Sequence, residues 1–201
     1  MANMNIRPPF IIFGMLGILL LGMAFVFSTA SRVRQPLAEM ATLGAVLPFE
    51  LTNSRGEPFA SSHLDGKVWV ADFIFTTCAG PCPLMSQKMA RLQRTFRRVP
   101  GLALVSFTVD PETDTPEVLA EYARLFGANP DKWHFLTGEY EAIQKIAVKS
   151  FALGSIEQPI HHSTYFTLVD RHGNIRGYFD SNDYSSMESL ITDIQRLLTA
   201  T

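Results

Sequence analysis

One stretch of this chain restricts its fold more than any other: the run VWVADFIF, from Val68 to Phe75, and the sequence TTCAGPCP that follows it. The run is almost entirely apolar and rich in β-branched and aromatic residues, which is typical of a strand buried on both faces of a sheet. Pro83 suits the first position of a helix. The sequence therefore predicts a buried strand, a short loop that carries both cysteines of the chain, and a helix.

The rest of the chain extends this pattern into an alternation of strands and helices. Turn-forming residues at Asn53–Gly56 predict a hairpin ahead of the buried strand. The further predicted elements are a helix over 83–99, a strand over 102–109, helices over 115–126 and 139–150, strands over 164–170 and 175–180, and a helix from Ser185 to about 198. Interleaved strands and helices favour parallel pairing through a crossover, and the last two strands favour an antiparallel edge. We expect an α/β, thioredoxin-like fold with an N-terminal hairpin extension, in a single domain over residues 46–201.

An uninterrupted apolar segment precedes this domain. Residues 10–27 contain no charged residue, no polar side chain and no proline. As a helix they would span ~27 Å, close to the ~30 Å hydrocarbon core of a bilayer. The sequence predicts a short cytoplasmic tail (1–9), a single transmembrane helix as anchor (10–30) and a tether (31–45). A signal peptide cleaved after Ala30 and a buried helix are the alternatives.

Charge does not decide the orientation of the predicted anchor, because Arg7 before it is balanced by Arg32 and Arg34 after it. A short tail that leads directly into an apolar span is how exported proteins begin, so we expect the folded domain on the periplasmic side of the cytoplasmic (inner) membrane. The whole chain has 17 basic and 19 acidic residues, a balance that gives no indication of a nucleic-acid partner.

The thiol pair, Cys78 and Cys82, is not needed to hold the fold together, because about 170 residues after the apolar segment suffice for a packed core. A thiol at a helix N-terminus has its pKa lowered below ~8.5, and the resulting thiolate is both a nucleophile and a soft metal ligand. Thioredoxin-type exchange uses two intervening residues, whereas this pair has three. Two cysteines are too few for an iron–sulfur cluster, and a structural zinc site requires four protein ligands. Cu(I) can be coordinated by two thiolates and one imidazole.

The chain has five histidines, and two of them have a position that suits such a site. His63, His134 and His172 are expected to be surface or structural side chains. His161 and His162 directly precede the strand predicted at 164–170. In a thioredoxin-like sheet the loop before that strand packs beside the thiol loop, so a histidine there can reach both sulfurs. Met85 and Met89 lie on the apolar stripe of the predicted helix and are expected to be core residues.

Three stretches, FIFTTCAGPCP, SFTVDPETDTPEVLAEYA and HHSTYFTLVDRHGNIRGYF, together resemble the Sco/SenC family, and the resemblance extends from Leu47 to Leu198. It implies a membrane-anchored, thioredoxin-like protein outside the bacterial cytoplasm. It also implies copper binding through a C-x-x-x-C-P motif and a distant histidine, in the assembly of the dinuclear copper centre of cytochrome c oxidase. The expected protein partner is the copper-bearing subunit of that oxidase.

Carried over by position, the resemblance implies that Cys78, Cys82 and His162 bind a copper ion. Many family members have an aspartate where this chain has His161. That leaves His161 either as a further ligand or as an exposed neighbour of the site. Delivery of copper, a metallochaperone role, is the expected function.

A second resemblance supports a redox enzyme as the alternative. The stretch VADFIFTTCAGPC is similar to the active-site stretch of thioredoxins, in which a buried acid assists proton transfer to the resolving thiol. Asp72 stands at that place, although a buried acid in an apolar strand can also belong to a structural salt bridge. The alternative is a thiol–disulfide oxidoreductase in which Cys78 attacks, Cys82 resolves and Asp72 relays the proton, and which keeps cysteines of the oxidase subunit reduced.

Overall fold

The structure is a computed structural model, and it describes residues 40–154 and 163–200. The predicted tail, anchor and most of the tether lie outside these ranges. Along residues 40–154 and 163–200, no helix combines the length and the apolar composition needed to cross a bilayer.

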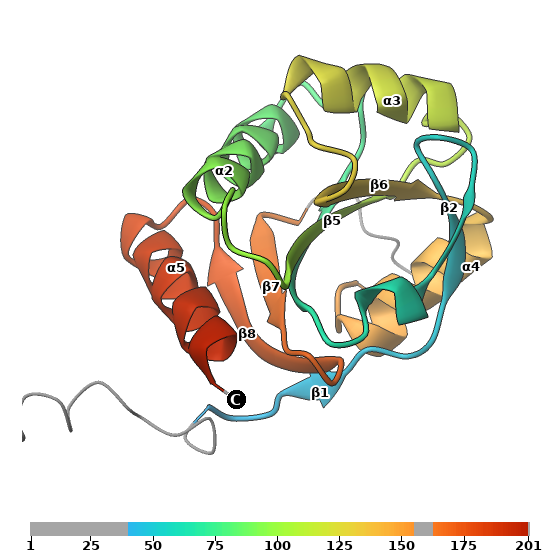
Figure 1. The fold of residues 1–201 in the computed structure, drawn as a ribbon. Helices are drawn as coiled ribbons and strands as arrows, with labels where there is room; N and C mark the ends of the chain where they lie inside the picture. Colours follow the sequence, from blue (N-terminus) through green and yellow to red (C-terminus); the bar gives the residue numbers. More distant parts are fainter. Residues whose placement is uncertain (1–39, 155–162, 201) are drawn as a thin grey trace, which may run out of the picture. The chain divides into compact units, whose positions relative to one another are not determined.

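The described residues form one mixed sheet of eight strands, in the order β1-β8-β7-β4-β5-β6-β2-β3 (Figure 1). The strands are β1 (Gly44–Ala45), β2 (Glu50–Asn53), β3 (Pro58–Ala60), β4 (Val68–Ile74), β5 (Leu102–Thr108), β6 (Trp133–Thr137), β7 (Tyr165–Val169) and β8 (Asn174–Asp180). The helices are α2 (Pro81–Thr95), α3 (Pro116–Leu125), α4 (Tyr140–Lys145) and α5 (Tyr184–Thr199), with a 3₁₀ turn at Ser61–Leu64 and a π-helical turn at Ile146–Ser150.

Strands β4 and β5 form the centre of the sheet, and every residue in both is buried. They pair in parallel through the α2 crossover, and β5 pairs in parallel with β6, whereas β7 and β8 add antiparallel neighbours on the other side of β4. This confirms the predicted α/β class, the parallel pairing and the antiparallel final pair. It also confirms the hairpin extension, because β2 and β3 pair antiparallel around a turn in which Gly56 has a φ of 76°.

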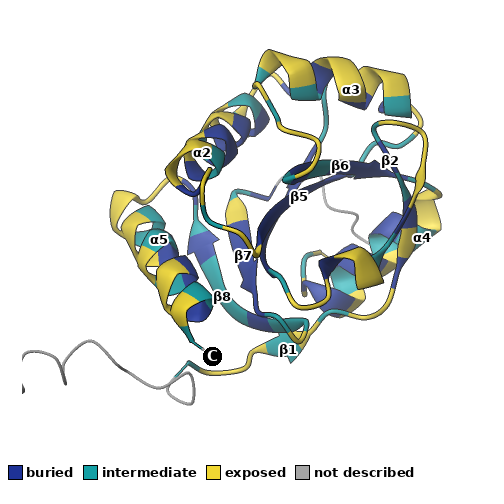
Figure 2. Cartoon of the chain, in the orientation of Figure 1, coloured by how far each residue is buried: buried dark blue, intermediate teal, exposed yellow. Residues whose placement is uncertain are grey.

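Helices cover both faces of the sheet (Figure 1). One face of β4 and β5, with side chains such as Trp69, Phe73 and Phe107, packs in one apolar cluster with Ile143 of α4 and with Phe151. The other face is covered by α2, α3 and α5, and Figure 2 shows that these helices bury the side toward the sheet and expose the other. Their amphipathic pattern thus supplies the second half of the core.

Three details of the sequence prediction were wrong or incomplete. The strand β6 was not predicted, although it joins β5 to the hairpin by pairing with both β5 and β2. Helix α2 begins at Pro81 rather than Pro83, so Cys82 is its second residue. Helix α5 begins at Tyr184 rather than Ser185, and it is capped by Asp183, whose side chain accepts a hydrogen bond from the backbone N–H of Ser185.

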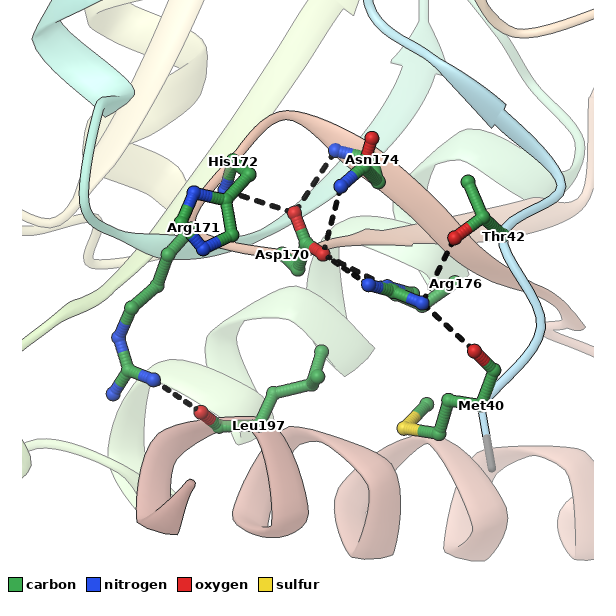
Figure 3. A network of polar contacts seen from close by, with 8 residues as sticks. All are labelled: Met40, Thr42, Asp170, Arg171, His172, Asn174, Arg176 and Leu197. Carbon is green, nitrogen blue, oxygen red and sulfur yellow. Dashed lines mark hydrogen bonds and ion pairs between the residues drawn. The ribbon is translucent and has the colours of Figure 1, made fainter. Parts of the chain in front are cut away.

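A buried polar network holds the first described residues to the end of the sheet (Figure 3). The Arg176 guanidinium forms an ion pair with Asp170 at 2.7 Å, and both side chains are largely buried. Arg176 also donates hydrogen bonds to the carbonyl oxygen of Met40, at 2.7 Å, and to the hydroxyl of Thr42. Since β7 runs antiparallel to β4 with Trp69 opposite Val169, this network lies at the edge where β4 begins. The thiols follow the other end of β4.

Candidate metal and thiol site

The loop between β4 and α2 places the two thiols at the carboxyl end of the central strand. Both cysteines are free thiols, and both are buried, with 6% of Cys78 and 3% of Cys82 exposed. Pro81 is the first residue of α2, a position where a helix loses nothing from the missing proline N–H. The structure therefore confirms that Cys78 lies in the loop after the strand, and it places Cys82 within the first turn of the helix rather than ahead of it.

The two thiols differ in acidity. Burial alone raises the pKa of the Cys78 thiol, but hydrogen bonds from the Cys82 thiol and from the backbone N–H groups of Cys82 and Gly80 outweigh it and lower that pKa. Burial and the thiol bond to Cys78 together raise the pKa of Cys82 to about 12. Cys78 is thus the thiol that ionises first, and Cys82 supplies the proton that stabilises the thiolate.

Asp72 lies on the face of β4 that packs toward α2 and α3, paired in register with Ser106 of β5. Its side chain is fully buried, and one carboxylate oxygen, Oδ1, accepts a 2.5 Å hydrogen bond from the Ser106 hydroxyl. The other, Oδ2, has no hydrogen-bond partner. Burial raises the pKa of Asp72 to about 7, although the Ser106 bond acts in the opposite direction. The structure shows no salt bridge for Asp72 among the described residues, so the structural alternative is not supported there.

Polar side chains that the sequence did not single out surround this carboxyl group. The indole N–H of Trp133 donates to the Ser106 hydroxyl at 2.9 Å, which leaves that hydroxyl free to donate to Asp72. The Tyr122 hydroxyl lies 3.0 Å from the Ser86 hydroxyl. Burial first, and then the negative charges of Asp72 and the two thiolates, raise the pKa of Tyr122 to about 12. These residues come from β5, β6, α2 and α3, so only the sheet and helix packing brings them together.

His161 and His162 lie outside the described residues, so the predicted third copper ligand has no described position. The described chain resumes at Ser163, which is buried and precedes β7. Thr167 of β7 pairs with Ala71 of β4 in antiparallel register. The start of β7 therefore lies beside the end of β4, at the edge that carries the thiols. Within residues 40–154 and 163–200, no group of three or more His, Cys, Asp or Glu side chains is placed to hold a metal ion.

The described histidines have structural surroundings, as expected. The rings of His63 and His134 pack against Phe59, with centroids 5.0 and 4.8 Å from its ring. Burial, followed by the nearby positive charges of Lys67 and Arg55, lowers the pKa of His134 to about 4. His172 lies in the turn between β7 and β8. Met85 and Met89 are 1% and 0% exposed, which confirms them as core residues.

This donor set suits two kinds of chemistry. Two neighbouring sulfurs, one of them readily ionised, form half of a soft-metal site. The same pair, next to a buried acid that exchanges its proton near neutral pH, suits thiol–disulfide exchange. Copper fits the residues present, because thiolates are the ligands that Cu(I) prefers and two of them already lie together.

Comparisons with known proteins find relatives of this chain in both sequence and structure. The sequence model of the SCO1/SenC family matches residues 39–199. The SCO1 protein homolog of Bacillus subtilis strain 168 is 31% identical over 89% of this chain and 94% of its own length. A solved structure of BsSco, described as a member of the Sco family of cytochrome c oxidase assembly proteins with a disulfide switch, is 31% identical with a TM-score of 0.69, over 80% of this chain and 97% of that one. Yeast Sco1 with copper bound is 26% identical with a TM-score of 0.61, over 77% of this chain and 90% of that one.

Proposed function

Because the chain belongs to the SCO1/SenC family, we propose that it binds copper through Cys78, Cys82 and His162 and delivers it to the copper-bearing subunit of cytochrome c oxidase. One observation carries the proposal: two reduced thiols lie together, Cys78 in the loop before α2 and Cys82 in the first turn of that helix, and their mutual hydrogen bond lowers the pKa of Cys78. The copper bound to yeast Sco1 and the family of oxidase assembly proteins to which BsSco belongs support copper as the cargo and the oxidase as its destination.

Loading follows from the acidity of the two thiols. Cys78 offers a thiolate first, and the Cys82 thiol must lose its proton before its sulfur can coordinate. A site with few ligands can release the ion by exchange, because thiolates of a recipient replace its own one at a time. Oxidation of the pair to a disulfide removes both sulfur ligands and would switch the site off.

His162 is proposed as the third ligand because of where the chain resumes. Ser163, its neighbour in the sequence, is buried next to the start of β7, at the sheet edge that carries the thiols. Consecutive Cα atoms are only about 3.8 Å apart, and this short link to Ser163 supports the choice of His162. His161 remains the alternative ligand.

We further propose that residues 10–30 anchor the chain in the cytoplasmic membrane, with the domain in the periplasm. The length of the apolar run supports this.

A titration of the reduced chain with Cu(I), under anaerobic conditions and against a competing chelator, tests the proposed ligands. We expect one tightly bound ion, a large loss of affinity in Cys78→Ser and Cys82→Ser, and a smaller loss in His162→Ala. His161→Ala is the matched control and should bind like the wild type. Unchanged affinity in His162→Ala would refute its assignment as a ligand.

The second candidate is a thiol–disulfide oxidoreductase, favoured by the unpartnered Oδ2 of Asp72. The Cys78 thiolate would attack a disulfide of the recipient, forming a mixed disulfide and releasing one recipient thiolate, which takes up a proton. Cys82 would give its proton to the Asp72 carboxylate and attack the Cys78 sulfur, and the second sulfur of the recipient would leave as a thiolate that takes up the proton held by Asp72. An external dithiol would then reduce the resulting Cys78–Cys82 disulfide and itself become oxidised to a disulfide. Turnover that falls in Asp72→Asn but not in His162→Ala would identify this reaction.

A further inference from the structure

The stretch between β5 and α3 contains a buried carboxylate that neither function above uses. Asp114 is 0% exposed, and it lies between the end of β5 and the cap of α3, Thr115. None of the ion pairs among the described residues includes it. A buried carboxylate without a cation is costly unless hydrogen-bond donors satisfy it.

Those donors come from the loop that carries the thiols and from the neighbouring strand. The backbone N–H of Thr76 lies 3.2 and 3.1 Å from the two carboxylate oxygens of Asp114. The Thr76 hydroxyl donates to Oδ1, and the hydroxyl of Thr108 in β5 donates to Oδ2. Thr76 is two residues before Cys78, so the carboxylate joins the thiol loop to β5.

We propose that Asp114 is a positioning residue, which fixes the loop from Phe75 to Gly80 so that the Cys78 sulfur is held beside Cys82 for metal uptake. This rests on the proposed copper function. Other bonds act beside this contact: the Val109 N–H donates to the Ile74 carbonyl at 2.8 Å, the Cys78 N–H donates to the Phe75 carbonyl at 3.3 Å, and the Cys78 sulfur accepts from the N–H groups of Gly80 and Cys82. The bonds to Asp114 are the ones that join Thr76 to the neighbouring strand.

The physical reason is preorganisation. Helix α2 fixes Cys82, and Asp114 fixes Thr76, so Cys78 lies between two restrained points. If the loop were loose, metal binding would have to order it, and that loss of conformational freedom would weaken affinity. Only an acceptor with two oxygens can satisfy the Thr76 N–H and both hydroxyls at once, which accounts for an aspartate at this buried place.

Matched variants separate positioning from general destabilisation. Thr76→Val removes the hydroxyl bond on the loop side. Thr108→Val removes the hydroxyl bond on the strand side and also the acceptor of the Asp110 N–H. It therefore loses at least as many hydrogen bonds as Thr76→Val. Asp114→Ala removes the whole set, and Asp114→Asn keeps an acceptor for the Thr76 N–H. Each variant is made in the full chain.

Two measurements are combined: Cu(I) affinity by chelator competition, and hydrogen exchange of residues 75–80 in the metal-free, reduced protein. We expect Cu(I) binding to weaken roughly tenfold in Asp114→Ala, a few-fold in Thr76→Val, and less than about twofold in Thr108→Val. Exchange of the loop should quicken in the first two variants but not in the third. Asp114→Asn should lie between the wild type and Asp114→Ala.

The positioning role is overturned if folded Asp114→Ala keeps wild-type affinity and loop exchange, or if Thr76→Val and Thr108→Val weaken copper binding equally. If Asp114→Ala does not fold, Thr76→Val and Asp114→Asn decide. A wild-type chain that binds no Cu(I) would refute the copper function instead, and loop exchange in the variants would still show whether Asp114 holds the loop.

Discussion

The buried acid Asp72 makes the stability of the protein depend on pH in a predictable direction. Its pKa rises from 3.8 to about 7 on folding, chiefly because burial disfavours the charged form. Between these values the native state keeps a proton that the unfolded chain releases, so stability falls as the pH rises through this window. A rise of about three pKa units corresponds to roughly 4 kcal/mol of unfolding free energy, fully lost above pH 7.

Asp72→Asn is the perturbation that isolates this effect. The amide is nearly the same size, stays neutral, and can still accept the Ser106 hydrogen bond through its oxygen. From pH 5 to pH 8 the wild type should lose about 3 kcal/mol that the variant does not lose. Urea unfolding of the reduced, metal-free proteins at pH 5 and pH 8 gives the change in unfolding free energy for the wild type and for the variant.

Comparing the variant with the wild type at each pH cancels the contributions of the other titrating groups. Asp65→Asn, at an exposed position, is the control for removal of an aspartate. If the difference in unfolding free energy between wild type and Asp72→Asn stays constant within about 0.5 kcal/mol from pH 5 to 8, Asp72 is not a buried acid of raised pKa, and its role as a proton relay loses its basis.

Three further predictions concern single contacts. Iodoacetamide at pH 7 should modify Cys78 well before Cys82, because the pKa of Cys78 is lowered and that of Cys82 is raised to about 12; peptide mass spectrometry checks this, and equal labelling would contradict it. Arg176→Ala should cost about 3–5 kcal/mol in urea unfolding, because it leaves the buried Asp170 carboxylate without its cation; a loss below 1 kcal/mol would refute this. Thr115→Ala should cost about 1 kcal/mol by the same assay, since Thr115 caps α3, and an unchanged midpoint would show that the cap is not used.

Sequence patterns predicted the helices and strands whose determining residues lie close together in the chain. The buried runs of β4 and β5 stand out in the sequence because strands covered on both faces tolerate few polar residues. The boundaries of α3 were also predicted from local residues: Thr115 caps the helix, Pro116 starts it and Gly127 follows its end with a φ of 64°. Each signal lies within a few residues of the structure it determines.

Long-range pairing was not predictable in this way. Strand β6 is five residues long and contains His134, so its apolar pattern is too short to separate from a loop. It becomes a strand because β5 and β2 provide partners on both sides, and β2 is about 80 residues away in the sequence, a separation that propensity cannot detect.

The residues of the candidate site show the same difference between local signals and long-range contacts. Cys78, Cys82 and Asp72 were predicted because they lie in one short stretch, from the strand to the helix. Ser106 and Asp114 were not, because each acts through a hydrogen bond to a residue 34 or 38 positions away. The stretch that contains Asp114 had been part of the family resemblance, but its contact with the thiol loop depends on β4 and β5 being neighbours.

X-ray absorption spectroscopy of the Cu(I)-loaded chain tests the proposed ligand set, because it identifies and counts the atoms bound to the metal. We expect two sulfur scatterers and one nitrogen in the wild type, with the nitrogen lost in His162→Ala and retained in His161→Ala. A copper site with a single sulfur, or one whose nitrogen persists in His162→Ala, would contradict it.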